Sequence, residues 1–505
     1  MNRNKKLILN TSTSLLHQLI SVICGFILPR VLLTTYGSTV NGLVSSVSQF
    51  LGFISLCEMG VGAVVQSALY KPLAEGDAVG ISKIAVSSER FFRKIAYILL
   101  VYTLVLMFVL PLKTIDDFSY GYTMLLVVVM SISFFAQYYF GMTYRLILTA
   151  DQLGFLQFIV NSVTLILNTI ASVVLANAGA SIQVLKLTTS MIFLLQPISL
   201  SLIAKRKYKI DRKIELTEEP IKQKWNGLAQ HVAAVVLGNT GTVVLTLFSS
   251  LNNVSIYAVY NLVVTGVKEL IRSLTNGVQA MFGNMLARNE ENVLNKAFES
   301  FEWLMHTGVT VIFSATALLI VPFVSVYTKG VTDVNYIIPI FAYLLVFATA
   351  AYCLRLPYNI MVLSAGHYKQ TQSSAIIEAV INIVLSVALV IRFELMGVAI
   401  GTLVSMLYRT VYLAWYLRKN IINRKFKHFV KHFVVDVIIV VTIILVYNFA
   451  NNFFVMGETT YFAWVILAVK VGVVCVLITG FINLIFYQKF IIEIVKFFVK
   501  KLKRK

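Results

Sequence analysis

The residues in this chain best suited to chemistry are charged side chains embedded in long apolar runs. In the segment NLVVTGVKELIRSLTNG, Lys268 and Arg272 are four residues apart, so on a helix they share one face. Glu269 precedes Arg272 by three residues and neutralises part of this charge. Two cations on one face suit an anion such as phosphate, which arginine can bind with two parallel hydrogen bonds. The pattern predicts a cationic, cavity-facing site, and a structural pair is the alternative.

Two further charges lie in the first apolar runs. Arg30 follows Pro29 toward the outer end of one run, where a cavity-facing cation and a side chain that snorkels to the headgroups are both open. Glu58 lies near the middle of the next run, and a shift of 214 residues places it on Arg272. We therefore expect the two to lie at similar depth, paired in one state of the protein and separated in another.

The remaining charges within apolar runs have structural interpretations that involve no ligand. Glu378 and Arg409 are expected to form a structural ion pair between neighbouring helices. Arg145 and Arg355 are expected to end their helices at the cytoplasmic face, and Asp436 to be hydrated near a helix end. The candidate substrate-binding residues are thus Arg30, Lys268 and Arg272, and the candidate coupling or gating residues are Glu58, Glu269, Glu378 and Arg409.

The composition sets the context for these charges. The chain has 505 residues, of which 58% are hydrophobic and 13% charged, and its mean hydropathy is +0.82. A soluble globular protein is nearer half apolar and one quarter charged, so an ordinary soluble enzyme and a disordered protein are excluded. Four cysteines lie in apolar runs without a CxxC or Cys/His cluster, and no nucleophile motif is present. We therefore predict no catalytic residue, no metal site and no bound cofactor.

Apolar runs of about 20 residues are long enough to span a bilayer as helices. The chain contains fourteen of them, which predicts an all-α polytopic membrane protein with about 14 transmembrane helices. Their approximate bounds are 8–33, 41–66, 92–112, 120–142, 154–177, 182–204, 227–249, 254–281, 301–327, 335–354, 371–391, 395–416, 432–450 and 461–486.

The distribution of charge predicts the orientation of these helices. The net charge is +21, and the cations gather in alternate loops, at 67–94, 205–226 and 417–431, and in the C-terminal tail. The opposite loops hold only the scattered cations Lys113, Lys186, Lys329 and Arg392. Because cytoplasmic loops of membrane proteins are enriched in lysine and arginine, both termini are predicted to be cytoplasmic. The basic charge then requires no nucleic-acid partner.

A weak internal repeat predicts how the helices are grouped. The shift of 214 residues places Tyr144 on Tyr358 and Asn168 on Asn382, and pairs the basic loops at 205–213 and 419–427. Six helices per repeat start both halves on the same side of the membrane, as in transporters with parallel repeats. The predicted organisation is an N-lobe at 1–204, a basic cytoplasmic linker at 205–226, a C-lobe at 227–418, two additional helices at 419–487, and a basic amphipathic cytoplasmic tail at 488–505.

Several segments resemble a known family. They are ILPRVLLTTYGSTVNGL, SLCEMGVGAVVQSALYKPLAEGD, MVLSAGHYKQTQSSAIIEAVINIVLSVALV and MGVAIGTLVSMLYRTVYL. The chain resembles the polysaccharide transporters, the Wzx-type flippases of the MATE-like MOP superfamily. The resemblance implies a protein of the bacterial cell membrane that moves undecaprenyl-diphosphate-linked oligosaccharide repeat units from the inner to the outer leaflet by alternating access. It also implies membrane lipids, a polysaccharide polymerase and assembly proteins as partners.

The resemblance extends to the charged residues, with one departure. The related lipid II flippases have a cationic cavity with arginines in their helices 1, 2 and 8. This sequence offers Arg30 in helix 1, and Lys268 and Arg272 in helix 8, but its second helix carries Glu58 instead. Glu58 is thus a candidate for coupling to H⁺ or Na⁺. The membrane potential is a further candidate driving force, since a headgroup with two negative charges gains about 4.6 kcal/mol on leaving a cell at 100 mV, inside negative.

Three other functions remain open alternatives. A MATE-type, cation-coupled exporter of drugs or small molecules would favour acidic residues in the N-lobe cavity, where Glu58 is the only obvious one. A membrane polysaccharide polymerase or ligase would need large outward loops. The predicted outward loops, such as TTYGST, KTIDDFSY and TKGVTDVNY, have about ten residues or fewer, so we expect a protein that is not an enzyme. A non-transporting scaffold for cell-wall assembly is not excluded by the sequence.

Overall fold

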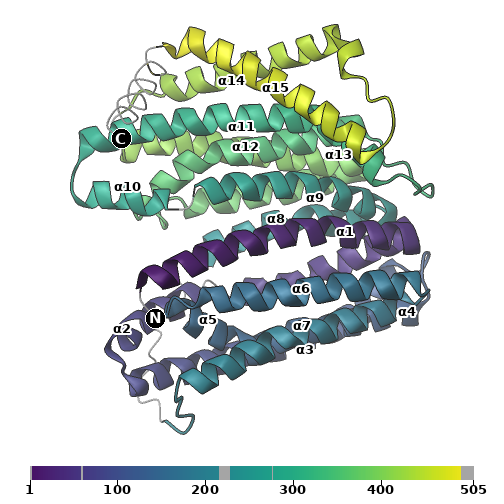
Figure 1. The fold of residues 1–505 in the computed structure, drawn as a ribbon, viewed down its shortest axis with the longest axis vertical. Coiled ribbons are helices and arrows are strands. Elements are labelled where there is room, and N and C mark those ends of the chain that lie inside the picture. The colour runs from purple at the N-terminus through teal and green to yellow at the C-terminus, as the bar shows by residue number, and fades with distance from the viewer. Residues whose placement is uncertain are drawn as a thin grey trace. The chain divides into compact units, whose positions relative to one another are not determined.

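The described part of the chain is helical. A computed structural model describes residues 3–58, 61–214, 228–275, 277–422, 424–488 and 490, and these contain no strand (Figure 1). In order along the chain the elements are α1 Arg3–Gly52, η1 Phe53–Glu58, α2 Val61–Glu75, α3 Ala78–Lys113, α4 Tyr120–Ala136, η2 Gln137–Gly141, α5 Met142–Ala150, α6 Gly154–Asn177, α7 Ile182–Lys207, α8 Leu228–Phe248, α9 Leu251–Leu274, α10 Val278–Ala287, α11 Glu291–Tyr327, α12 Pro339–Ser364, α13 Gln372–Asn420, α14 Lys427–Phe449, η3 Asn451–Phe454 and α15 Tyr461–Phe486.

The lengths and apolar faces of these helices make this a multi-pass membrane protein. Eleven stretches among the described residues are long and apolar enough to cross a bilayer, and Val232–Phe248 is a shorter apolar helix. Two of the eleven, Ile8–Glu58 with 51 residues and Gln372–Asn420 with 49, are about twice the length that one crossing requires. Each contains one residue with non-helical backbone angles, Gly37 and Glu394.

At these two residues the long helices fold back on themselves. In α13 the amide of Asn382 donates to Ser405 at 3.3 Å and to Thr402 at 3.2 Å. A straight helix would separate residues 382 and 405 by roughly 35 Å, so the chain reverses at Glu394. In α1, Gly37 takes a φ of +84°, which only glycine adopts without strain. With these two reversals the helices follow the fourteen predicted runs, and the all-α polytopic prediction is confirmed.

Two helices are longer than their apolar runs predict. The run at 120–142 continues through the π-helical turn η2 into α5, so Arg145 lies within a helix. The run at 335–354 continues to Ser364, and Arg355 lies inside α12 with only 7% of its surface exposed. The expectation that these two arginines end their helices is therefore wrong. Each is followed by further apolar residues, and for Arg355 a buried partner offsets the cost of its charge.

The chain forms two compact units. The N-terminal unit consists of residues 1–259, 330–334 and 390–394, and the C-terminal unit of residues 260–329, 335–389 and 395–505. In the N-terminal unit α6 lies beside α7 and α1, and α3 packs on α4 (Figure 1). In the C-terminal unit α12, α14 and α15 all pack on α11. The predicted linker and tail lie largely outside the described residues, since 215–227 and 491–505 are not described.

A carboxylate–tyrosine–arginine triad links three segments of the N-terminal unit. The hydroxyl of Tyr144 on α5 donates to Glu89 on α3 at 2.5 Å, and it accepts from Arg212, which follows α7, at 2.6 Å. Arg212 also lies 3.4 Å from the carboxylate of Glu89. The basic segment that follows α7 is thereby attached to the helices of its own unit.

The same triad occurs in the C-terminal unit. The hydroxyl of Tyr358 on α12 donates to Glu302 on α11 at 2.8 Å, and Arg424, which follows α13, forms an ion pair with Glu302. These residues follow Glu89, Tyr144 and Arg212 by 213, 214 and 212 positions. Chance does not place one chemical arrangement at three matching positions on corresponding helices, so the triads support the internal repeat.

A second polar cluster fixes the start of α1. The carboxylate of Asp151, in the turn between α5 and α6, accepts from Lys6 at 2.8 Å and also from Lys207 and Tyr208. Partial burial disfavours the charge of Asp151, but the hydrogen bonds from Lys207, Lys6 and Tyr208 outweigh it and lower its pKa. The ionised carboxylate therefore holds together three segments that are distant in sequence.

We predict that Asp151→Asn destabilises the protein at neutral pH and that this effect disappears in acid. Because folding lowers the pKa of Asp151, its contribution is fully present above the pKa of the unfolded chain and is lost as the pH falls through the folded value. Melting temperatures of wild type and variant in detergent should therefore converge as the pH falls. A difference that stays constant down to the pH of carboxyl protonation would contradict the prediction.

Candidate functional site

A buried ion triad lies among α12 and both halves of α13 in the C-terminal unit. The carboxylate of Glu378, whose side chain is fully buried, accepts from Arg409 at 2.7 Å and forms a second ion pair with Arg355. The predicted pair of Glu378 and Arg409 is present, but it carries an additional arginine. One carboxylate between two guanidinium groups leaves one positive charge in excess. Both Nε atoms are buried without a hydrogen-bond partner among the described residues.

The ring of Tyr352 connects this triad to the cations of α9. The guanidinium of Arg355 lies 4.5 Å from the ring centroid, and the ammonium of Lys268 lies 5.7 Å from it. Both distances allow a cation–π interaction, which stabilises a cation in a poorly hydrated place. Arg272 is one helical turn beyond Lys268 and pairs with Glu269 at 3.0 and 3.2 Å.

We call this set of residues the cationic cluster: Lys268, Glu269, Arg272, Tyr352, Arg355, Glu378 and Arg409. Its four cations and two carboxylates leave a net charge of +2. Such a charge within membrane-spanning helices is costly unless a ligand neutralises it, and it identifies a candidate site. The half-exposed Arg272 and the orphaned Nε donors of Arg355 and Arg409 give the cluster both an accessible face and unused hydrogen-bonding capacity.

The sequence identified five of the cluster's seven members and missed the other two. Lys268, Glu269, Arg272, Glu378 and Arg409 stood out as charges within apolar runs. Arg355 was discounted because it falls just after an apolar run, and Tyr352 carries no charge. Arg30 lies half-buried in α1 of the N-terminal unit, so its role beside these cations stays a prediction.

The N-terminal unit contains a polar cavity of about 570 Å³. Its lining comes from α1, η1, α2, η2, α5 and α6: Asn10, Glu58, Gly62, Gln66, Gln137, Met142, Arg145, Leu146, Thr149, Gln152, Gly154, Gln157 and Phe158. The π-helical turn η2 presents Gln137 to this cavity, and π-turns of this kind are frequent at functional sites. Asn10 and Glu58 border one cavity only because α1 reverses at Gly37.

Two charges of this cavity have partners within the unit. Glu58 accepts a hydrogen bond of 2.5 Å from the hydroxyl of Tyr138. Arg145 donates to the carboxamide oxygen of Gln157 at 2.8 and 3.3 Å, in the amide orientation that satisfies both groups. The predicted pairing of Glu58 with Arg272 stays a prediction, since each has a partner in its own unit. One carboxylate, one guanidinium and five carboxamides make the cavity polar and nearly neutral.

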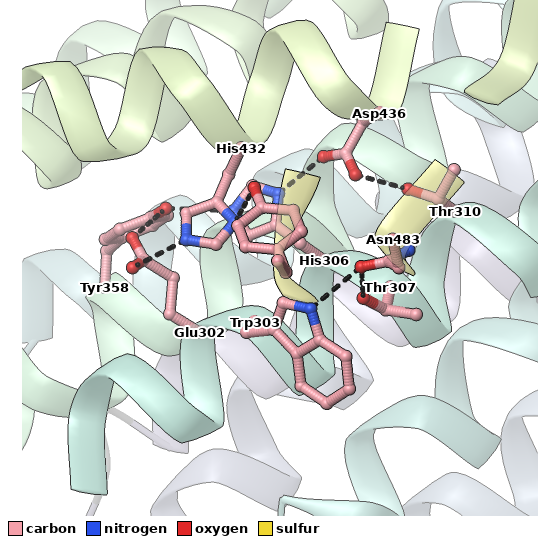
Figure 2. Close-up of polar contacts among 10 residues, drawn as sticks. Glu302, Trp303, His306, Thr307, Thr310, Tyr358, His432, Asp436 and Asn483 are labelled. Carbon is pink, nitrogen blue, oxygen red and sulfur yellow. Dashed lines mark hydrogen bonds and ion pairs between the residues drawn. The ribbon is translucent and has the colours of Figure 1, made fainter. Parts of the chain in front are cut away.

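A third polar region, among α11, α12 and α14, is shown in Figure 2. Asp436 lies here, with only 7% of its surface exposed; it is 2.5 Å from Nδ1 of His306 and accepts a hydrogen bond of 2.8 Å from Thr310. The expectation of a hydrated Asp436 is wrong, because α11 covers it with His306 and Thr310, which the position of Asp436 in its own helix does not reveal. Among the described residues, no group of three or more histidines, cysteines or acids is placed to hold a metal ion.

The comparisons with known proteins concern the fold. No family model matches the chain, and no curated protein matches it in sequence. Among solved structures, the lipid II flippase MurJ in an inward closed conformation matches with a TM-score of 0.69 over 96% of this chain and 100% of its own, at 15% identity. An inward-facing multidrug resistance MATE transporter of the MOP superfamily matches with a TM-score of 0.59 over 82% of this chain and 97% of its own, at 14% identity.

This chain has the MurJ and MATE fold. At identities of 15% and 14% the likeness extends to the arrangement of the helices and not to their side chains. The two neighbours are transporters, and the fold agrees with the MATE-like MOP architecture that the sequence predicts. The roles of the candidate residues must therefore be argued from this chain's own geometry.

We predict that Glu378→Gln destabilises the C-terminal unit far more than Glu269→Gln. Removing the Glu378 charge leaves Arg355 and Arg409 buried without compensation, which costs about 3–5 kcal/mol in comparable cases. Glu269 is 39% exposed, so the loss of its ion pair should cost less than about 1 kcal/mol. Unfolding of the purified variants in detergent measures both. Equal destabilisation would show that the arginines of the triad do not depend on Glu378.

Proposed function

We propose that the protein is a flippase that moves undecaprenyl-diphosphate-linked oligosaccharide repeat units from the inner to the outer leaflet of a bacterial membrane, for the synthesis of a cell-surface polysaccharide. The observation that carries this proposal is the cationic cluster, with its net charge of +2 among membrane-spanning helices of the C-terminal unit. A diphosphate is the part of such a substrate that a surplus of two cations would neutralise.

The chemistry of the cluster suits phosphate oxygens. Guanidinium groups can donate two parallel hydrogen bonds to phosphate, and an ammonium binds it as a point charge. Arg272 and Lys268 are the members that could reach a ligand, while Glu378 and Arg409 hold Arg355 in place beside Tyr352. We assign substrate binding to Lys268, Arg272 and, in the N-terminal unit, Arg30. Glu58, Glu269, Glu378 and Arg409 are the proposed coupling or gating residues.

The polar cavity of the N-terminal unit suits sugars. A carboxamide both donates and accepts hydrogen bonds, as a sugar hydroxyl does, and five carboxamides line this cavity. A volume of about 570 Å³ lies within the range of small-ligand sites. An apolar drug would gain little from such a lining. We therefore assign contacts with the oligosaccharide to this cavity.

The flippase is favoured over the drug exporter and over the polymerase. The MurJ structure covers 96% of the chain, whereas the MATE structure covers 82%. The net-positive cluster is also unsuited to the cationic substrates of a drug exporter. A polymerase would need a catalytic group outside the membrane, and the described loop between α11 and α12, residues 328–338, is too short to form a catalytic domain.

We predict that Lys268→Ala combined with Arg272→Ala reduces surface polysaccharide at least about tenfold, since two charge-assisted contacts to phosphate are together worth more than 1.4 kcal/mol. The lipid-linked precursor should accumulate in the inner leaflet. Quantifying both in cells at normal expression tests the proposal. The matched control is Lys470→Ala, which removes a cation of α15 whose contacts among the described residues are the carbonyl and the ring of Phe453.

Three other outcomes of this experiment would contradict the proposal. Unchanged polymer and precursor in the double variant would reject the cationic cluster as the substrate site. Loss of drug resistance without any change in polysaccharide would favour the MATE-type exporter. Loss of polymer without accumulation of precursor would indicate a step other than translocation, as a polymerase would show.

We predict that Gln66→Leu combined with Gln137→Leu slows export of the oligosaccharide while binding of the bare lipid diphosphate is retained. Leucine keeps the bulk of glutamine but cannot donate or accept a hydrogen bond. Native mass spectrometry with undecaprenyl diphosphate, with and without the oligosaccharide, separates the two effects. Gln279→Leu, at an exposed position of α10 that bonds Tyr368, is the control. Equal loss of both ligands would contradict a sugar-specific cavity.

A further inference from the structure

The network in Figure 2 permits a count of protons, because each hydrogen bond between two acceptor atoms needs one. His306 on α11 is at its centre and is 2% exposed. Its Nδ1 lies 2.5 Å from Asp436 on α14, and its Nε2 lies 2.9 Å from the hydroxyl oxygen of Tyr358 on α12. Which ring nitrogen carries a proton follows from what these two neighbours can supply.

Tyr358 cannot supply the proton for its contact with His306. Its hydroxyl donates to Glu302 at 2.8 Å, and Glu302 is held in the ionised form by its ion pair with Arg424. Were the hydroxyl to turn to His306, the phenol and carboxylate oxygens would face each other without a proton. His306 must therefore use its own Nε2 proton on Tyr358, which exhausts the single ring proton of a neutral histidine.

The contact between His306 and Asp436 consequently requires one additional proton. Asp436 is buried and already accepts from Thr310 at 2.8 Å, so it has no proton to give when ionised. The additional proton resides on His306, as an imidazolium beside a carboxylate, or on Asp436. In both cases the bonded pair holds one proton more than a neutral histidine beside an ionised aspartate.

His432, the second histidine of the network, can make both of its hydrogen bonds as a neutral ring, without an additional proton. Its Nδ1 lies 2.8 Å from the hydroxyl of Tyr487, which can donate to it, and its Nε2 lies 3.3 Å from Glu302. Its ring stacks on that of His306 with centroids 4.9 Å apart, and two imidazolium rings at this distance would repel each other. The network thus holds one exchangeable proton at His306 and Asp436.

The charge balance leads to the same result. Arg424 neutralises Glu302, so Asp436 is the one carboxylate of the network without a permanent cation as its partner. Among the described residues, the charged and titratable groups that surround the network are Glu299 on α11, Arg418 on α13, Lys425 before α14, Lys427, His428 and Lys431 on α14, and Tyr487 after α15. With the proton bound, the buried groups sum to zero, and without it one uncompensated negative charge remains inside the helices.

The proton site adjoins an apolar cavity of about 260 Å³. Asp436, Phe433 and Val437 of α14 form one wall, and Thr310 and Phe313 of α11 lie opposite them. The hydrogen bonds of Asp436 with His306 and Thr310 thus attach α14 to α11 along the edge of this cavity. Loss of the proton removes the first of these bonds and leaves a carboxylate charge in the apolar wall with the Thr310 hydroxyl as its remaining donor.

We propose that a single proton, bound between His306 and Asp436, is a ligand of the C-terminal unit that fastens α14 to α11 and so fixes one wall of the apolar cavity. Binding of the proton is expected to strengthen the attachment, and a rise in pH to weaken it. A proton gradient would thereby act on a helix pair, α14 and α15, that lies outside the predicted repeat. The inference is independent of which substrate the protein carries.

The direct test is the protonation state of His306. The full chain, labelled with ¹⁵N in histidine and held in detergent, is titrated by NMR, with His306→Gln used for assignment. Wild type should show both ring nitrogens of His306 protonated at low pH, with loss of one proton as the pH rises. In Asp436→Asn, the amide donates to Nδ1, so His306 should stay neutral throughout the titration. A neutral His306 at every pH in wild type would overturn the proposal.

Hydrogen exchange of the α14 amides tests the attachment. Comparing wild type with Asp436→Asn at the same pH cancels the intrinsic pH dependence of exchange. The two should exchange alike at low pH, and wild type should exchange about tenfold faster for each pH unit above the midpoint, as linkage to one proton requires. Thr310→Val is the control, since it removes a bond to Asp436 but leaves the proton, so its exchange should keep the pH dependence of wild type. If Asp436→Asn does not fold, His306→Gln, which lacks the titrating pair, replaces it as the reference. A ratio of wild-type to reference exchange that does not change with pH rejects the proposal.

Discussion

Every part of this structure is constrained by the cost of placing charge among helices that lie in lipid. A buried ion pair offsets that cost only when the geometry is good and the remaining donors are satisfied. The described charges meet this requirement in different ways. Asp151 lies outside the spans and takes three donors, Glu302 takes an arginine, and Glu378 takes two. Glu378 with its two arginines carries one positive charge in excess, and this excess belongs to the candidate ligand site.

The repeated triad neutralises a carboxylate in the same way in both halves of the chain. Glu89 and Glu302 each receive a tyrosine hydroxyl and an arginine from the basic segment that follows the last helix of the half. The second triad continues through Tyr358 to His306 and on to α14, whereas Glu89 of the first triad pairs in addition with Arg93. On our proposal, this connection to α14 holds a single proton and makes the second copy of the triad responsive to pH.

The sequence predicted the fold well and the site only in part. Apolar runs of membrane-spanning length fixed the helices, including the two pairs that reverse at Gly37 and Glu394. Charges within those runs drew attention to Lys268, Arg272 and Glu378. The sequence could not reveal which partner each charge finds, because Arg355 and Asp436 meet residues on other helices. The network of His306 was missed for the same reason, since a histidine carries no signal until its neighbours are known.

Under the proposed function, the two units divide the chemistry that a lipid-linked sugar requires. A surplus of positive charge favours a diphosphate but discriminates poorly between sugars, because charge attraction does not depend on where the sugar hydroxyls point. Carboxamides have the reverse property, since each must be matched by a donor or an acceptor at a defined place. A carrier that held only the first site would move the lipid diphosphate bare, and one that held only the second would bind sugars without their anchor. Under the proposed function, the cationic cluster of one unit would select for the diphosphate and the amide-lined cavity of the other for the sugar, so that the preferred substrate has both parts.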